Sequence, residues 1–198
     1  MSFAVFLQPL GALELEIENW KNKVEKVYPN QPFTCHPPHL TLINLEVINE
    51  IASIETIIKQ IENIKPFKIQ INSTAVFWND KLTDGHTLHF GVNKNSELYR
   101  LQKKVAYALY PGKKIINPPD YILENNDLLN SFNQFGFPFI GQHWIPHFSI
   151  SSIKKGKNDS LIKEFLATEI DFSLLIDKVG LWRVQDDSHE KLNNILLT

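Results

Sequence analysis

The chain has 198 residues, of which 43% are hydrophobic and 21% are charged, and its formal net charge at pH 7 is −2. This length and composition predict one soluble globular domain with a substantial core. The near-neutral charge excludes the broad basic surface that grips long nucleic acids, so a nucleic-acid substrate has to be short or held in a local pocket. Only two of the 20 basic residues are arginines, Arg100 and Arg183, which leaves few bidentate clamps for phosphate.

The single cysteine, Cys35, excludes an internal disulfide and a cysteine zinc cluster, and it suits a reducing compartment. The apolar segment at 2–8 is too short for a signal peptide. No stretch of the sequence approaches the length of a membrane span. We therefore expect a cytoplasmic protein that makes no membrane contact.

Hydrophobic periodicity predicts the pattern β-α-β-α-β in the first half of the chain. Leu13, Ile17 and Trp20 recur at helical spacing, which predicts a helix with one buried face. Short apolar runs rich in Phe, Ile and Val are typical of strands. The predicted elements are a strand at 3–8, a helix at 12–28, a strand at 38–45, a helix at 49–63 and a strand at 66–78.

The second half repeats this order with one insertion. The predicted elements are a strand at 86–92, a helix at 95–109, a strand at 146–153, a helix at 158–170 and a strand at 172–185. The first helices of the two halves start 83 residues apart, whereas the third elements carry equivalent histidines 108 residues apart, at 39 and 147. The second half thus holds about 25 extra residues, within an irregular insert at about 110–145. Such an insert is typical of a lid or a specificity loop.

The two halves also correspond residue by residue around these histidines. The segment Pro-His-Leu-Thr-Leu at 38–42 corresponds to Pro-His-Phe-Ser-Ile at 146–150. Two copies are too few for a solenoid. The sequence therefore predicts an α+β fold in one bilobed domain, 1–198, in which repeats at about 1–80 and 84–186 form two similar β-α-β-α-β lobes related by a pseudo-two-fold axis.

Each of these segments places a histidine and a hydroxyl residue on one strand face: His39 with Thr41, and His147 with Ser149. If the lobes are pseudo-symmetric, two imidazoles and two hydroxyls converge on one cleft. One neutral histidine can then take a proton from water or a ribose hydroxyl, while the other, protonated, gives a proton to the leaving oxygen of a phosphodiester. The hydroxyls can donate hydrogen bonds to the non-bridging phosphate oxygens. This scheme needs no metal ion and no cofactor.

The paired segments resemble the His-x-[Ser/Thr]-x motifs of the 2H phosphoesterase superfamily. Its members include the RNA 2′,3′-cyclic phosphodiesterases long called 2′-5′ RNA ligases. The resemblance covers most of the chain and implies a bilobed α+β fold with antiparallel sheets flanking a central cleft. It implies that His39 and His147 are the catalytic pair and that Thr41 and Ser149 bind phosphate. The long insert before the second motif departs from the family pattern.

Aromatic residues in and after the insert are candidates for stacking a nucleobase. Trp144 is the best placed because it lies just before the second motif strand, and Phe139 and His143 lie close to it in the sequence. The alternative is that the aromatic rings pin the insert onto the second lobe, which is the commoner role of large aromatic residues. A surface position would explain His143 equally well.

The spacing of the remaining histidines does not indicate a metal site. His86 and His89 face opposite sides of a strand, so chelation is poor, and we expect one to be exposed and the other packed. His36 precedes two prolines and is expected in a loop, and His189 is expected to be solvated in a charged tail. No carboxylate or cysteine stands at ligand spacing from a histidine.

The sequence therefore predicts a phosphodiesterase that hydrolyses the 2′,3′-cyclic phosphate of an RNA terminus or a nucleotide to a monoester. A related alternative is cleavage of 2′-5′-linked or cyclic oligonucleotides, which a lid-like insert would suit. Two other classes remain: a non-catalytic RNA- or nucleotide-binding module, against which the four intact motif residues argue, and a zinc hydrolase. The expected partner is an RNA terminus or a small oligonucleotide, and the expected state is a monomer. The near-symmetry of the motifs leaves the acid and the base unassigned.

Overall fold

The computed structural model describes the whole chain, residues 1–198, with five α-helices, three short 3-10 helices and eight strands. The α-helices and strands in chain order are β1 (Ser2–Leu7), α1 (Ala12–Val27), β2 (Leu40–Leu45), α2 (Glu50–Ile61), β3 (Phe67–Asp80), β4 (Gly85–Val92), α3 (Ser96–Leu109), α4 (Asn126–Phe135), β5 (His147–Ile153), α5 (Ser160–Leu166), β6 (Phe172–Ile176), β7 (Lys178–Gln185) and β8 (Ser188–Leu196). The 3-10 helices are Tyr110–Gly112, Asp120–Ile122 and Gly141–His143. The elements predicted before residue 171 all form, with ends shifted by at most four residues.

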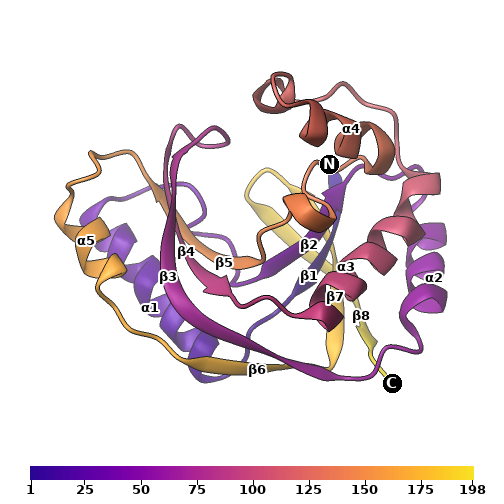
Figure 1. Ribbon diagram of the computed structural model, residues 1–198, viewed down its shortest axis with the longest axis horizontal. Coiled ribbons are helices and arrows are strands. Elements are labelled where there is room, and N and C mark those ends of the chain that lie inside the picture. Colours follow the sequence, from indigo (N-terminus) through magenta and orange to yellow (C-terminus); the bar gives the residue numbers. More distant parts are fainter.

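All strands pair antiparallel, in two sheets of four with the orders β2-β1-β7-β8 and β5-β4-β3-β6. β2 and β5, the two motif strands, are therefore edge strands, and they contact each other where the sheets meet. Figure 1 shows the two sheets between two groups of helices. This arrangement confirms the predicted α+β fold with antiparallel sheets.

Each sheet combines strands from both halves of the chain. β3 ends the first half but lies in the second sheet, and β7 belongs to the second half but pairs with β1 in the first sheet. The single strand predicted at 172–185 breaks at Asp177 into β6 and β7, because this segment pairs first with β3 and then with β1, in different sheets. The repeats at 1–80 and 84–186 therefore exchange their last strands, and neither repeat builds a lobe alone.

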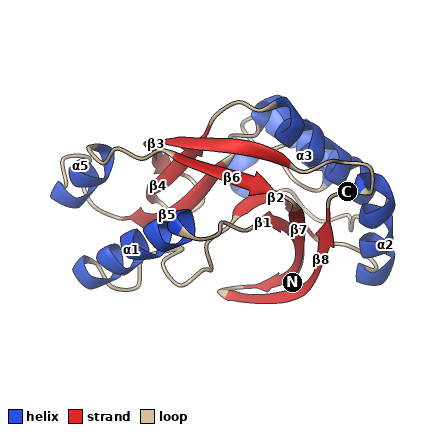
Figure 2. Cartoon of the chain, turned by 90° about the horizontal axis from the view of Figure 1, so that it is seen from below, coloured by secondary structure: helices blue, strands red, loops and turns tan.

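The helices cover the outer faces of the sheets, again across the two halves. α1 packs on β5 and β6, and α5 packs on β3, whereas α3 packs on β2 and on α2. Figure 2 shows α1 and α5 at one end of the molecule and α2 and α3 at the other. Trp20 of α1 meets Phe165 of α5 edge to face, with ring centroids 5.0 Å apart. One continuous core of 40 buried residues runs through both sheets.

Two elements have no counterpart in the sequence prediction, α4 and β8. α4 lies in the insert and has ordinary helix ends: the side chain of Asn125 accepts hydrogen bonds from the N–H groups of Asp127 and Leu128, and Gly136 terminates it at φ 73°. β8 pairs with β7 along its length. Its exposed charged residues hide the strand pattern, because it is an edge strand with little buried surface.

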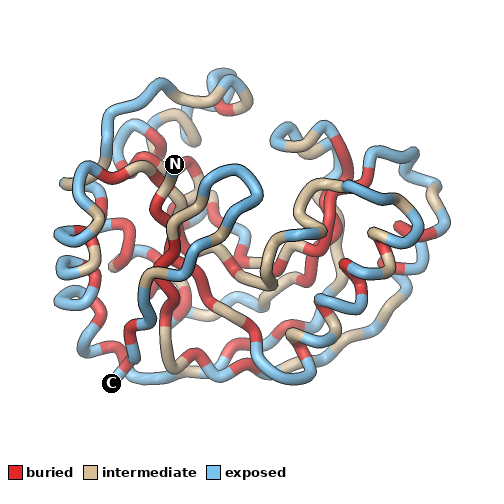
Figure 3. The backbone as a smooth tube through the Cα atoms, turned by 180° about the vertical axis from the view of Figure 1, so that it is seen from behind, coloured by how far each residue is buried: buried red, intermediate tan, exposed pale blue.

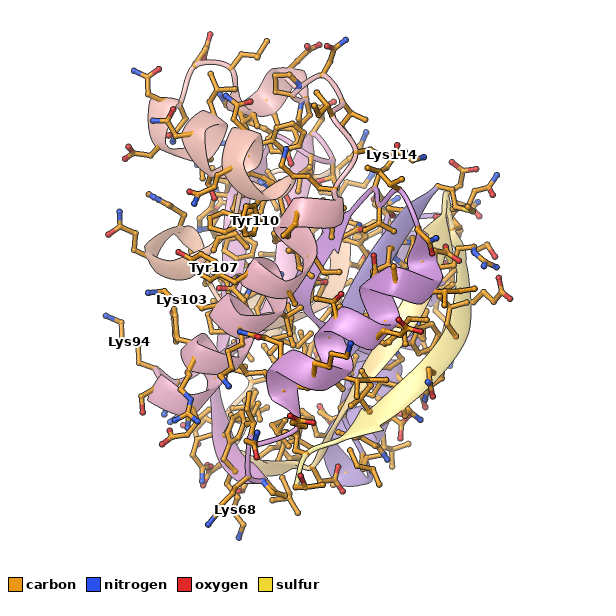
Figure 4. The ribbon with its side chains drawn as sticks, turned by 90° about the vertical axis from the view of Figure 1, so that its right-hand side faces the viewer. Lys68, Lys94, Lys103, Tyr107, Tyr110 and Lys114 are labelled. Atoms are coloured by element: carbon orange, nitrogen blue, oxygen red, sulfur yellow. The ribbon has the colours of Figure 1, made fainter.

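The outer surface of the helices faces solvent. Buried segments gather in the inner strands, and exposed segments lie in the turns, on the outer faces of the helices and along the edge strand β8 (Figure 3). Lys103, Tyr107 and Tyr110 are exposed along and after α3 (Figure 4). No helix of the chain combines the length and the apolar character needed to cross a membrane.

Candidate active site

The two motifs occupy matching places on the touching edge strands. His39 immediately precedes β2, and His147 is the first residue of β5. Thr41 pairs with Phe6 of β1, and Ser149 pairs with His89 of β4. Because β2 and β5 contact each other, both motifs lie at one junction between the sheets.

Both imidazoles are held in the same way. Nδ1 of His39 lies 2.7 Å from the carbonyl oxygen of Pro37, and Nδ1 of His147 lies 2.7 Å from that of Ile145, in each case two residues earlier. A carbonyl oxygen only accepts, so Nδ1 carries the hydrogen and donates it. In the neutral ring Nε2 is then unprotonated and free to take a proton. The proline between acceptor and histidine in both motifs restricts this turn.

Burial lowers the pKa of both motif histidines. The pKa of His39 is lowered to about 3, chiefly by burial, and the neighbouring His189 and Lys21 lower it further, against the effect of the backbone hydrogen bond. Burial also lowers the pKa of His147, but there the backbone hydrogen bond and the carboxylate of Asp80 both oppose it. Without a ligand both rings are therefore neutral near pH 7, and an anionic phosphate beside them favours protonation.

The hydroxyls of the two motifs are available to a ligand. Thr41 and Ser149 are both partly exposed, and neither hydroxyl makes a hydrogen bond to another residue. The backbone carbonyl of Thr41 accepts instead from Nε1 of Trp144 at 3.1 Å. A hydroxyl with no protein partner can exchange a water molecule for a phosphate oxygen at little cost. Each motif can therefore offer one imidazole and one hydroxyl donor to a ligand.

Each motif strand is anchored by a side chain from the opposite half of the chain. Nζ of Lys21 in α1 donates to the carbonyl of Ile150 at 3.1 Å, and Nε2 of Gln102 in α3 donates to the carbonyl of Leu42 at 3.2 Å. The two carbonyls are equivalent, one residue after the motif hydroxyl, and both donor side chains are buried. An edge strand leaves such carbonyls without a ladder partner, so these contacts satisfy them and fix the strand position.

Different rings flank the two histidines. His39 stacks on Phe6, with centroids 4.0 Å apart and planes at 20°. His147 meets His89 and Phe77 edge to face, at 5.1 and 4.9 Å. Phe6 and His89 are equivalent, since they are 83 residues apart, the same interval as the first helices of the two repeats. The duplication thus places a phenyl ring in one motif region and an imidazole in the other.

The structure corrects the expectation for His86 and His89. Both are buried, at 7% and 4% exposure, because β4 is an inner strand covered on both faces. They do face opposite sides: Nδ1 of His86 accepts from the N–H of Asn79 at 3.0 Å, whereas His89 faces His147. Burial, followed by the charge of His147, lowers the pKa of His89 to about 3.

Sequence reasoning missed a polar cluster beside His39. The rings of His36 and His189 are 4.4 Å apart, and that of His189 is 5.6 Å from the ring of His39. Nε2 of His36 lies 3.1 Å from Oδ1 of Asp187. His36 is in a loop, as expected, but His189 is a half-buried residue of β8 and not part of a solvated tail. Sequence spacing carries no signal for this cluster, because the two segments are 151 residues apart.

A cavity of about 380 Å³ lies between the turn that joins β3 to β4 and the insert. Its walls are formed by Asp80, Lys81, Leu82, Tyr121, Glu124, Asn125, Leu128 and Phe139. Nζ of Lys81 and Oε2 of Glu124, 3.5 Å apart, join the two walls. Burial raises the pKa of Tyr121, and Asp80 adds to this effect just as it raises the pKa of His147. The cavity therefore lies near the second motif.

The three residues predicted to bind substrate have different surroundings. Phe139 lines the cavity described above. Trp144 is only 4% exposed, packs edge to face on Tyr99, and anchors β2 through the carbonyl of Thr41. Its ring has no free face on which to stack a base, so the structure gives it an anchoring role instead. His143 is partly exposed and lies 3.3 Å from the Gln142 amide nitrogen, and its ring contacts neither motif histidine.

The sequence of the chain identifies its family. The profile of the 2′-5′ RNA ligase superfamily matches residues 9–188. The chain belongs to this superfamily. The match confirms the resemblance to the 2H phosphoesterases. No curated protein matches the chain in sequence.

Solved structures share the fold of this superfamily member along its whole length. TT0787 of Thermus thermophilus aligns with a TM-score of 0.68 at 13% identity, covering 100% of this chain and 98% of that chain. Apo LigT of E. coli aligns with a TM-score of 0.59 at 10% identity, covering 100% and 97%. LigT complexed with 3′-AMP gives 0.58 at 12% identity, with the same coverage. At these identities the similarity concerns the fold alone.

Proposed function

We propose that the protein is a phosphodiesterase that hydrolyses the 2′,3′-cyclic phosphate of an RNA terminus or a nucleotide without a metal ion. The proposal rests on the matched imidazoles, each with Nδ1 bonded to the carbonyl two residues earlier and each standing two residues before an unengaged hydroxyl. Membership of the 2′-5′ RNA ligase superfamily supports a phosphoesterase-type enzyme. The solved complex of LigT with 3′-AMP supports a substrate of nucleotide size.

In the proposed reaction a water molecule attacks the phosphorus in line with one P–O bond of the cyclic phosphate. A neutral histidine takes the proton of this water at Nε2 as the new bond forms. The other histidine, protonated, gives its Nε2 proton to the ribose oxygen as the old bond breaks. Release of the 3′ oxygen leaves a 2′-phosphate monoester. The histidine that acts as the base has gained one proton, and the histidine that acts as the acid has lost one. Proton exchange with water returns both rings to their starting states.

The phosphate charge is then stabilised by hydroxyls and imidazoles, without Arg183. Thr41 and Ser149 donate to the non-bridging oxygens, where negative charge builds up in the transition state. Arg183 is already engaged, because its guanidinium pairs with Glu50 at 2.6 Å and with Glu190 at 2.5 Å. These hydrogen-bond donors suit a small substrate whose phosphate is bound at the two motifs themselves.

The cavity beside the second motif supports a nucleoside portion in the substrate. Its volume of about 380 Å³ is within the range of small-molecule sites, and its walls combine the aromatic rings of Tyr121 and Phe139 with polar groups. A cavity of this size beyond the phosphate also suits a second nucleoside of a 2′-5′-linked or cyclic oligonucleotide. Such oligonucleotides are therefore the second candidate substrate.

The test is hydrolysis of the four nucleoside 2′,3′-cyclic monophosphates in EDTA by the wild type and by His39→Ala and His147→Ala. We expect turnover by the wild type and a loss of at least ~100-fold in each variant, the usual scale for a general acid or base. His143→Ala is the matched control, because it removes a nearby histidine outside both motifs, and it should retain activity.

Three other results would redirect or refute the proposal. Turnover only of 2′-5′ or cyclic oligonucleotides would establish the second candidate substrate. No turnover of any of these by folded wild type would contradict the proposed activity and favour a binding module. Activity that EDTA abolishes and Zn²⁺ restores would favour a zinc hydrolase.

A further inference from the structure

Three donor groups of different chemical types meet beside the first motif. The thiol of Cys35, the imidazole of His36 and the carboxylate of Asp187 each offer one ligand atom, and these atoms all lie within 4.8 Å of one another. Nε2 of His36 and Oδ1 of Asp187 are already 3.1 Å apart. In a tetrahedral zinc site with Zn–S about 2.3 Å and Zn–N about 2.0 Å, ligand atoms lie roughly 3.3 to 3.6 Å apart. Small side-chain rotations therefore bring the donors to zinc-binding distance.

Both segments that carry these donors are fixed to the protein. In the loop before His36, the carbonyl of Pro32 accepts from Oγ of Ser151 at 3.1 Å and from the N–H of Ser152 at 3.0 Å. Two prolines follow His36 and restrict the backbone on its other side. Asp187 lies in the two-residue turn that β7 and β8 close. Donors on fixed segments need little ordering when they bind a metal.

The donor set indicates which metal binds. Zn²⁺ takes thiolate, imidazole and carboxylate ligands in tetrahedral sites, whereas Mg²⁺ and Ca²⁺ prefer oxygen ligands only. Cys35 and Asp187 are exposed, so an ion reaches them from solvent. The imidazole of His36 is supported by its packing against the ring of His189.

We propose that Cys35, His36 and Asp187 bind one Zn²⁺ ion, with water completing the tetrahedron. The thiol of Cys35 loses its proton to solvent on binding. The ion clamps the loop that leads into the first motif to the turn between β7 and β8, segments 151 residues apart. This site goes beyond the proposed hydrolysis and does not depend on it, because the reaction scheme uses none of the three ligands.

The test is Zn²⁺ binding by reduced, metal-stripped full-length protein in competition with a chromogenic chelator. We expect one ion per chain and a rise in the thermal unfolding temperature on adding Zn²⁺ but not Mg²⁺. Cys35→Ser and Asp187→Asn should each weaken binding at least about tenfold, since losing even an outer partner of a ligand costs that much. Asp186→Asn is the matched control, because it removes the neighbouring exposed charge of the same turn and should leave binding unchanged.

Binding of Co²⁺ identifies the ligands directly. A thiolate ligand gives a sulfur-to-cobalt charge-transfer band, which should be present in the wild type and in Asp186→Asn and absent in Cys35→Ser. Zn²⁺ binding that Cys35→Ser and Asp187→Asn leave unchanged would overturn the proposal by placing the ion elsewhere. Absence of binding to the reduced wild type would overturn it outright. None of these measurements uses catalytic activity, so the result does not depend on whether hydrolysis is found.

Discussion

The regions around His39 and His147 have the same backbone geometry but different electrostatic surroundings. Both rings donate Nδ1–H to the carbonyl two residues earlier. The positively charged Lys21 and the ring of His189 oppose a proton on His39, whereas the carboxylate of Asp80 favours one on His147. A duplication therefore supplies two equivalent imidazoles, and the residues around them make the two unequal.

This difference leads us to expect separate roles. A general base has to be neutral before the reaction, and a general acid has to be protonated. The positive charges around His39 disfavour a proton on its ring, whereas the carboxylate of Asp80 favours one on His147. We therefore expect His39 to act as the base and His147 to act as the acid in hydrolysis.

A substrate with a good leaving group separates the two roles and gives the largest expected effect. Departure of 4-nitrophenolate needs no proton, so loss of the acid costs little with a 4-nitrophenyl nucleotide ester. We expect His147→Ala to lose at least ~100-fold on a 2′,3′-cyclic phosphate and much less on the ester. His39→Ala should lose a similar factor on both substrates. If His39→Ala, and not His147→Ala, kept most of its activity on the ester, His39 would be the acid and His147 the base. If both variants kept equal activity on the ester, the residues around the two histidines would not determine which is the acid and which the base.

Removing the carboxylate of Asp80 should make the electrostatic surroundings of the second motif more like those of the first. Asp80→Asn retains an oxygen that can accept from Oγ1 of Thr87, now 2.6 Å from the carboxylate. Because Asp80 raises the pKa of His147, the variant should lower it further. The protonated acid is then lost at lower pH, so the decline of kcat/KM with rising pH should move to lower pH. We expect a loss of several-fold near pH 7, less than that from removing either histidine.

The measurement is the pH profile of kcat/KM, with Asp84→Asn as its control. Asp84 is exposed in the same turn between β3 and β4 and has φ 56°, which asparagine tolerates. A profile of Asp80→Asn that coincides with those of Asp84→Asn and the wild type would contradict the role given to Asp80.

How far sequence predicted the site depends on whether the contacts are local or distant. The motif strands and their histidine and hydroxyl residues follow from strand periodicity and from the repeat, which sequence contains. Pairing partners are not local: β6 and β7 separate at Asp177 only because β3 and β1 lie in different sheets. Trp144 shows the same limit, since its bond to the carbonyl of Thr41 spans 103 residues. Its place in the sequence suggested a ring that stacks a nucleobase, and its contacts make it an anchor.

The different surroundings of the two motifs could likewise not be predicted from neighbouring residues in the sequence. Asp80 is the last residue of the first repeat, but the hairpin of β3 and β4 brings it to the second motif. The interval of 83 residues that relates Phe6 to His89 was present in the sequence, since it also relates the first helices. Aligning the first strands at that interval identifies His89 as the residue beside the second motif.

The smallest expected effect on activity comes from His89→Phe, which makes the second region resemble the first. Phe6 already stacks on His39 at the equivalent position, so a phenyl ring suits this place in the fold. His89 takes up a proton below about pH 6.5 in the unfolded chain but only below about pH 3 in the folded one. Between these values the unfolded state binds one more proton, and wild-type stability falls as pH falls.

The variant should therefore lose stability less steeply on acidification. We expect the slope of unfolding free energy against pH between 6 and 4 to decrease by about one proton, or ~1.4 kcal/mol per pH unit. Urea denaturation at several pH values measures this slope, with His143→Phe, at a partly exposed histidine, as the control. Activity should fall far less than in either motif variant, because His89 packs against His147 and has no part in the proton transfers. A large loss of activity in a stable His89→Phe variant would mean that hydrolysis requires the imidazole of His89 and not only a ring of similar shape at this position.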